Sequence, residues 1–116
     1  MPIEFTELIA SHRNEVTLCS GEAAASRIGN EVDLIVLDVR EPAEFAAGSI
    51  TGAVNVPRGF LEFKIAEVCS APDPPILIHC KSGGRAVLAA KTLADMGYTN
   101  VEVYFGAFED LLAATR

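Results

Sequence analysis

Two short apolar runs are the clearest feature of the hydrophobic pattern along the chain. They extend from Leu34 to Val39 and from Ile76 to Cys80, and both are rich in β-branched residues with almost no polar interruption. Continuous apolar strands of this kind are typical of a parallel sheet, because helices cover both of its faces. We therefore predict that both runs are central strands of a largely parallel sheet.

Helical patterns surround these two strands. They predict helices at residues 4–12, 21–28, 41–46, 60–68, 85–96 and 107–114, and weaker strands at 16–18 and 101–104. Ser20 is a suitable N-cap for the second helix, and Gly97 is suited to end the helix that begins at Arg85. Because strands and helices alternate, we predict an α/β fold in which a central, mostly parallel sheet has helices on both faces.

The length and composition fit one domain. The chain has 116 residues, of which 50% are hydrophobic and 22% are charged, so we expect a single domain over residues 1–116. A net charge of −7 argues against nucleic acid or an anionic membrane as a partner, because both would repel it. No apolar run approaches the roughly 20 residues that span a bilayer, and the first residues lack the pattern of a signal peptide. A cytoplasmic location is therefore expected.

The three cysteines, Cys19, Cys69 and Cys80, show no Cys-x-x-Cys spacing. Neither a disulfide framework nor a zinc site is indicated, and we expect no metal and no cofactor. The position of Cys19 and Cys69 next to predicted helices leaves two interpretations open. Either cysteine can be a resolving thiol if the fold brings it close to Cys80, but inert, partly buried thiols are the favoured interpretation.

The segment from His79 to Arg85 carries the candidate chemistry. Cys80 ends a buried strand, and a helix is predicted to begin just beyond it, which is where sites gather in open α/β sheets. Gly83 and Gly84 permit a tight loop whose N–H groups point inward. Those donors, the start of the helix and the cations Lys81 and Arg85 all favour a thiolate, which is the nucleophilic form of cysteine. We expect the sulfur of Cys80 to be anionic and open to attack.

Three blocks of sequence resemble the rhodanese homology domain family. The first runs from Leu37 to Phe45 and continues from Gly48 to Pro57, the second is the cysteine loop, and the third runs from Gly97 through Glu109. Together they cover nearly the whole chain, and the chain is similar to single-domain sulfurtransferases. The resemblance implies a rhodanese-like domain.

The resemblance also implies a reaction. Cys80 would take the outer sulfur of a donor such as thiosulfate, or of a persulfide, and pass it to cyanide, a thiol or a sulfur-accepting protein. The backbone N–H groups of the loop, residues Lys81, Ser82, Gly83, Gly84 and Arg85, would cradle the Cys80 persulfide. Arg85 would hold the loop and add positive charge.

Two other functions remain open. A rhodanese-like domain can serve as a binding or sulfur-relay module that acts only with a protein partner. Phosphatase or arsenate-reductase chemistry is less favoured, because four residues separate Cys80 from Arg85, whereas the related phosphatase loops place five between cysteine and arginine. The shorter loop makes a smaller cradle, which suits a sulfur atom better than a tetrahedral phosphate.

Four positions depart from the family pattern. Lys81 stands where many members have Arg, which keeps the charge but gives up bidentate recognition of an oxyanion. Ser49 stands where a His is frequent in the family, and Ala107 replaces the second of two glycines. Leu111 stands where a Trp is common. These changes bear on substrate choice and on the rim of the pocket, and none of them removes the nucleophile.

Several residues near the loop have a structural interpretation. Asp38 and Arg40 follow the first central strand and can reach the site, but a buried ion pair, for example between Arg40 and Glu44, is the favoured explanation. Strand alternation points His79 away from the face that Cys80 uses, so packing is favoured over acid–base catalysis.

Two phenylalanines allow two interpretations. Phe60 and Phe63 can form an apolar wall beside the pocket, although aromatic residues at such a spacing are more often part of the core.

Overall fold

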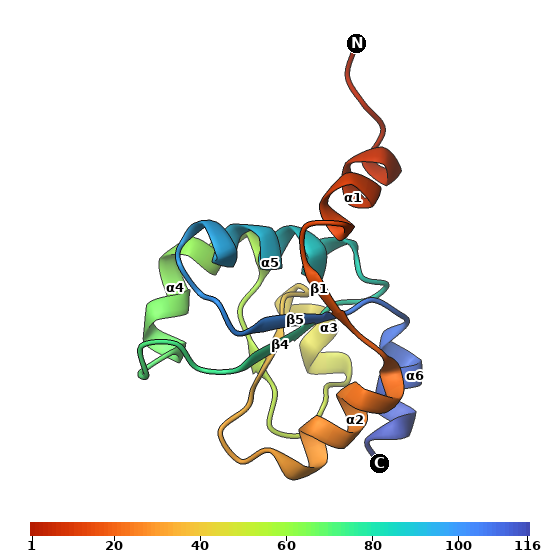
Figure 1. Cartoon of the computed structure of the whole chain (residues 1–116). Helices are drawn as coiled ribbons and strands as arrows, with labels where there is room; N and C mark the ends of the chain where they lie inside the picture. Colours follow the sequence, from red (N-terminus) through yellow and green to blue (C-terminus); the bar gives the residue numbers. More distant parts are fainter.

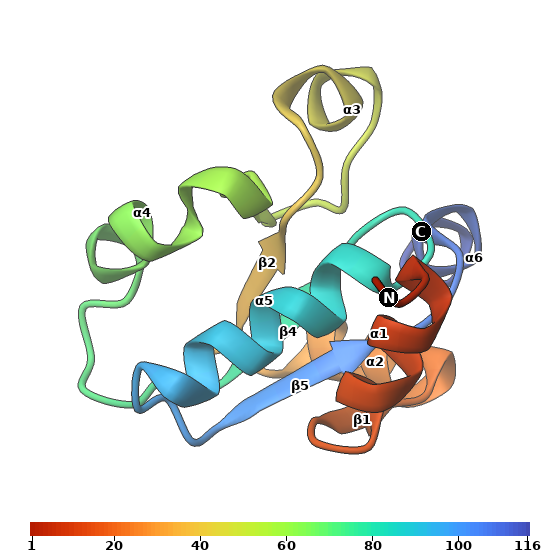
Figure 2. The ribbon, with the colours of Figure 1, turned by 90° about the horizontal axis from the view of Figure 1, so that it is seen from above.

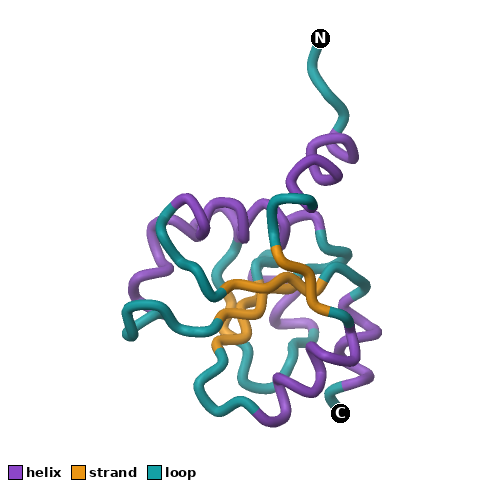
Figure 3. Tube along the Cα trace, viewed as in Figure 1, coloured by secondary structure: helices purple, strands orange, loops and turns teal.

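The computed structural model describes all residues, 1–116, and shows a parallel sheet between two layers of helices (Figures 1 and 3). Its elements, in chain order, are α1 (Phe5–Arg13), β1 (Thr17–Cys19), α2 (Gly21–Asn30), β2 (Ile35–Asp38), α3 (Pro42–Ala47), β3 (Val54–Asn55), the 3-10 helix η1 (Arg58–Phe60), α4 (Leu61–Val68), β4 (Ile76–His79), α5 (Gly84–Asp95), β5 (Val101–Tyr104) and α6 (Phe108–Ala114).

The five strands lie in the order β1-β5-β4-β2-β3, and every neighbouring pair is parallel. β4 is central, with Ile78 opposite Leu37 of β2 on one side and Val103 of β5 on the other. Because all strands point the same way, the segments that follow β2, β4 and β5 leave the sheet at the same edge. The fold therefore brings the loops after Asp38, His79 and Tyr104 together.

Two apolar cores form, one on each face of the sheet. The larger core lies under α1, α4 and α5, whose buried side chains include Ile9, Ile65 and Leu93. The smaller core lies under α2 and α6 and contains Ala24 and Leu111. In Figure 1, α4 and α5 lie above the sheet and α2 and α6 lie below it. None of the helices is long and apolar enough to cross a membrane.

The structure confirms the predicted α/β fold, and most predicted elements end within one or two residues of the observed ones. One strand was not predicted, the two-residue β3 at the edge of the sheet. Periodicity cannot reveal so short a segment. The helix predicted from Phe60 begins instead with the 3-10 turn Arg58–Phe60, and its α-helical part starts at Leu61.

A buried ion pair closes the end of β2. Asp38 is fully buried, and its carboxylate accepts hydrogen bonds from Nε and Nη2 of Arg40, the shortest at 2.8 Å. The predicted partner of Arg40 was Glu44, which is wrong. The observed partner, Asp38, lies only two residues from Arg40 in the chain. The Nη2 group of Arg40 also donates to the carbonyl of Gly48 at 2.8 Å. Arg40 thereby ties the end of the strand to the end of α3.

Replacing Asp38 with Ala is expected to destabilise the protein by about 3–5 kcal/mol, because it leaves the guanidinium of Arg40 buried without a counter-charge. Urea denaturation measures the free energy of unfolding. Glu67→Ala is the matched control, because Glu67 pairs with Lys64 at 3.8 Å on the exposed face of α4, and it should cost less than about 1 kcal/mol. Equal losses in the two variants would contradict this account of the pair.

Candidate active site

Cys80 follows the last residue of β4, and the loop from Cys80 to Gly83 leads directly into α5. Figure 2 shows this connection and the neighbouring α1 from above. Cys80 belongs to the larger core, on the face of the sheet that α5 covers. The side chain of the preceding residue, His79, stacks on Phe108 in α6, on the opposite face. Strand alternation thus separates the two side chains as predicted.

The sulfur of Cys80 has a backbone donor within the loop. The N–H of Gly83 donates to Cys80 Sγ at 3.0 Å. Gly83 has φ 115°, in the left-handed region that favours glycine, and a β-carbon built there would lie 2.5 Å from the ring of Phe105. A side chain at this position would meet both backbone strain and a steric clash. Glycine is therefore required for the turn that aims this N–H at the sulfur.

Two further backbone bonds fix the ends of the loop. The N–H of Phe108 donates to the carbonyl of Lys81 at 2.9 Å, and the N–H of Val87 donates to the carbonyl of Gly83 at 3.0 Å. The first bond joins the loop to the start of α6, and the second is part of the first turn of α5. Because Gly83 is the N-cap of α5, the positive end of this 12-residue helix begins beside the sulfur.

Arg85 forms an ion pair with the carboxylate of Glu44 on α3. Its Nη1 and Nη2 groups donate to Glu44 at 2.7 and 3.1 Å, and this pair ties α5 to α3. The hydrogen bonds from Arg85 lower the pKa of Glu44 to about 2, and Glu44 in turn raises the pKa of Arg85. Glu44 also closes the capping box of α3, because its carboxylate accepts the N–H of Glu41 at 2.9 Å. The guanidinium of Arg85 is thus engaged within the protein.

Cys80 is only 1% exposed, so the sulfur is less open than the sequence suggested. Beside the loop, between α3 and the start of α6, lies a hollow of about 310 Å³. Its lining residues are Arg40, Glu44, Ala47, Lys81, Ala107, Phe108 and Glu109. Lys81 is exposed, and no carboxylate lies within ion-pair distance of it. The loop therefore offers one unpaired cation at this opening, while its sulfur lies beneath the surface.

His79 is fully buried, and neither of its ring nitrogens has a hydrogen-bond partner. Burial lowers its pKa, although the carboxylate of Asp38, 4.0 Å from Nε2, acts in the opposite direction. We consider the neutral ring the relevant form, because burial is the larger effect. His79 therefore packs under the site, and its ring lies on the face of the sheet opposite to the side chain of Cys80.

Three of the family departures, Ala107, Leu111 and Ser49, lie in different places. Ala107 is exposed and lines the hollow, so its methyl group does alter the rim. Leu111 is buried in the smaller core, where it contributes to packing and not to the rim. Ser49 is half-buried and does not line the hollow.

The other two cysteines are free, buried thiols. Burial raises the pKa of Cys19 and of Cys69, which disfavours a nucleophilic thiolate at both positions. Neither lines the hollow beside Cys80. No group of three or more His, Cys, Asp or Glu side chains is placed to hold a metal ion.

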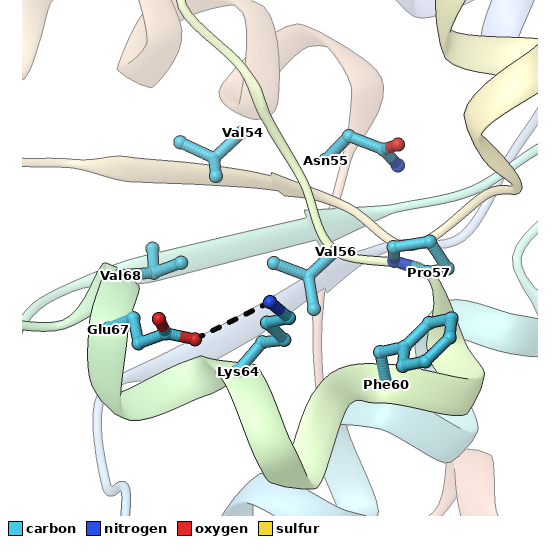
Figure 4. Close-up of a pocket in the computed structure, with 8 residues that line it drawn as sticks. All are labelled: Val54, Asn55, Val56, Pro57, Phe60, Lys64, Glu67 and Val68. Atoms are coloured by element: carbon cyan, nitrogen blue, oxygen red, sulfur yellow. Dashed lines mark ion pairs between the residues drawn. The ribbon is translucent and has the colours of Figure 1, made fainter.

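A larger hollow, of about 530 Å³, lies between β3 and α4 (Figure 4). Its walls include Val54, Pro57 and Phe60, and no residue of the cysteine loop reaches it. Phe60 is 56% exposed and Phe63 80% exposed, so the prediction that they pack in the core was wrong. The alternative, an apolar wall beside the cysteine, is also not observed, because Phe60 lines this separate hollow.

The sequence of the chain matches the rhodanese-like domain over residues 20–114. The protein therefore belongs to the rhodanese-like domain family. Its relatives support sulfur transfer as the general chemistry. A sulfurtransferase of Allochromatium vinosum is 31% identical over 80 residues, which cover 69% of this chain and 73% of that protein. The human thiosulfate:glutathione sulfurtransferase is 32% identical over 89 residues, covering 66% and 77%. Some relatives are longer, and the chain spans 57% of a similar Bacillus subtilis protein.

Solved structures share the fold. The human single-domain sulfurtransferase superposes with a TM-score of 0.71 at 26% identity, covering 84% of this chain and 96% of that one. A Rhodopseudomonas palustris protein of unknown function, called a possible tyrosine phosphatase, superposes with a TM-score of 0.84 at 25% identity, covering 98% and 92%.

Sequence reasoning missed two groups at the site. The pairing of Glu44 with Arg85 joins residues 41 positions apart, and no local pattern in the sequence marks such a contact. The ring of Phe5, which lies against Gly84, carried no sequence signal, and Phe105, which lies against Gly83, stood out only as part of the third family block.

The ion pair between Glu44 and Arg85 predicts a pH-dependent contribution to stability. Because the pKa of Glu44 falls from 4.5 to about 2 on folding, the stabilisation is complete above pH 4.5 and is lost as the pH falls towards 2. Glu44→Gln should therefore cost about 1 kcal/mol at neutral pH and progressively less below pH 4.5, as measured by urea denaturation across pH. Glu109→Gln removes an unpaired carboxylate from the same rim and should show no such trend. A pH-independent cost for Glu44→Gln would refute the assignment.

Proposed function

We propose that the protein transfers sulfane sulfur through a persulfide on Cys80. The observation that carries this proposal is the N–H of Gly83 aimed at Cys80 Sγ at 3.0 Å, at the start of α5. A donor in this place stabilises negative charge on the sulfur, both as thiolate and as persulfide. The same group thus supports the nucleophile before the reaction and the product after it.

In the first step, the thiolate of Cys80 attacks the outer sulfur of the donor. With thiosulfate, a new S–S bond forms at Cys80, the S–S bond of thiosulfate breaks, and its electron pair leaves with sulfite. The enzyme then carries the anionic persulfide. Sulfite is a good leaving group, so this step needs no general base. The position of His79, which is buried on the other face of the sheet, is consistent with a step that needs no base.

In the second step, an acceptor attacks the outer persulfide sulfur. A thiolate gives a new persulfide, and cyanide gives thiocyanate, while the electron pair of the broken S–S bond returns to Cys80 as thiolate. The outer sulfur lies about 2.05 Å from Cys80 Sγ, where the amides of the loop can hold it until the acceptor attacks. Because Cys80 itself is 1% exposed, the first step favours a small donor.

The remaining loop residues have distinct roles in this proposal. Lys81 and Ser82 are both exposed, and Lys81 lines the opening, where its charge attracts an anionic donor. Gly84 begins α5 and adds the positive end of the helix. Arg85 anchors the loop through Glu44 and supplies background positive charge.

Thiosulfate as donor and a thiol as acceptor are the substrates we propose, since the name of the human relative specifies thiosulfate and glutathione. A relay of sulfur to a protein is the second candidate, favoured by the burial of Cys80 and by a similar Bacillus subtilis protein named a putative sulfur carrier. Phosphatase chemistry ranks lower. The fork of Arg85 that would bind phosphoryl oxygens is already occupied by Glu44.

Treatment of the intact protein with thiosulfate is expected to add one sulfur atom, about 32 Da, and a thiol should remove it. Mass spectrometry of the intact protein and of the peptide that contains Cys80 measures the adduct. The double variant Cys19→Ser/Cys69→Ser should retain it, and Cys80→Ser should lose it. Failure to form the adduct with thiosulfate and with small persulfides would defeat the proposal. Cys80-dependent hydrolysis of an aryl phosphate would favour the phosphatase alternative.

Lys81→Ala should raise the thiosulfate concentration at half-saturation about 3- to 10-fold, because the opening loses its unpaired cation. Lys81→Arg should preserve affinity, and added salt should reduce the difference between wild type and Lys81→Ala. Steady-state kinetics at several ionic strengths measures both effects. An unchanged half-saturation in Lys81→Ala would remove Lys81 from donor recognition.

A further inference from the structure

α1 lies outside the segment that defines the family, since the match begins at residue 20 and α1 spans Phe5–Arg13. It packs beside α5, the helix that begins at the cysteine loop, as Figure 2 shows. Ile9 inserts into the larger core and explains how α1 is attached. Phe5 has a different position, because 59% of it remains exposed to solvent. Burial of apolar surface therefore explains only in part why residue 5 is a phenylalanine.

The ring of Phe5 lies directly on the loop. A β-carbon built on Gly84 would be 2.8 Å from Cζ of Phe5, so the ring occupies the space that any side chain at Gly84 would need. Phe105 does the same at Gly83, where the built β-carbon would be 2.5 Å from its ring. The two adjacent glycines are thus each covered by an aromatic ring, one from α1 and one from the segment after β5.

α1 also contacts the second ring. The guanidinium of Arg13 lies 4.4 Å from the centroid of the Phe105 ring, within the range of a cation–π interaction. No carboxylate lies within ion-pair distance of Arg13, so the ring of Phe105 is its defined partner. These residues enclose a hollow of about 290 Å³ beside the loop, and Ser82 and Gly84 form its other wall.

Glycines leave a loop free to change conformation unless its surroundings prevent it. A rotation of the peptide before Gly83 would turn its N–H away from Cys80 Sγ and remove the 3.0 Å bond. The ring of Phe105 limits the movement of Gly83, and that of Phe5 limits the movement of Gly84. Catalytic donors are effective when they are held in place before charge develops.

We propose that α1 is a positioning element for sulfur transfer. Phe5 directly, and Arg13 through Phe105, hold Gly83 and Gly84 so that the N–H of Gly83 stays on the sulfur of Cys80. This inference rests on the proposed persulfide chemistry. Phe5, Arg13 and Phe105 are positioning residues, because they act through the loop glycines.

The test compares Phe5→Ala and Arg13→Gln with Ile3→Ala. Ile3 is the matched control, because it is also 59% exposed in the same N-terminal segment and is not among the nearest neighbours of either loop glycine. Single-turnover persulfide formation with saturating thiosulfate is expected to slow roughly 10-fold in the first two variants, with little change in half-saturation. The Arg13→Lys variant retains a cation over the ring and should recover most of the rate. Ile3→Ala should behave as wild type.

A second readout does not depend on any sulfur donor. Amide hydrogen exchange, followed by NMR, should be about 10-fold faster at Gly83 in Phe5→Ala and Arg13→Gln, while the amide of Ile78 in β4 and the melting temperature stay near wild type. Exchange at Gly83 equal to that of wild type would overturn the positioning role. The positioning role would also be overturned if the rate of persulfide formation fell only in proportion to a lower melting temperature. If wild type forms no persulfide but exchange at Gly83 responds, the proposed function fails and the positioning of the loop stands.

Discussion

The hydrogen bond from the Gly83 N–H to Cys80 Sγ is the interaction on which the site depends. It exists because a parallel strand ends at His79, a helix starts at Gly84, and the chain between them turns through a left-handed glycine. The fold supplies the rest of the environment. β4 is the central strand, so its end lies deep in the molecule, and the sulfur is held where solvent does not compete with a backbone donor.

Ion pairs around this loop serve to fix its surroundings. Arg85 binds Glu44 of α3, and Arg40 binds Asp38 and the carbonyl of Gly48. Both guanidinium groups are therefore engaged with the protein, and Lys81 remains as the unpaired cation of the loop. Such an arrangement favours a reaction in which the backbone stabilises the anion and one exposed side chain attracts it. An oxyanion held by a bidentate arginine would need one of those pairs to break.

Sequence patterns predicted the architecture well because buried parallel strands leave an unmistakable continuous apolar run, as at 76–80. They also marked Cys80 and the two loop glycines as candidates, since these residues lie close together in the chain. The failures concern contacts between distant segments. The pairing of Arg85 with Glu44 and the exposure of Phe60 and Phe63 depend on how α3 and α4 dock. No local periodicity encodes that docking, and the depth of the sulfur below the surface likewise follows only from the assembled loops.

The most direct test of the central claim is a crystal structure of the protein after brief exposure to thiosulfate. Our account predicts one additional sulfur atom bonded to Cys80 Sγ, lying inside the loop within hydrogen-bonding distance of the N–H of Gly83 or its neighbours. An unmodified Cys80, or a persulfide whose outer sulfur turns away from amides that face solvent, would contradict it.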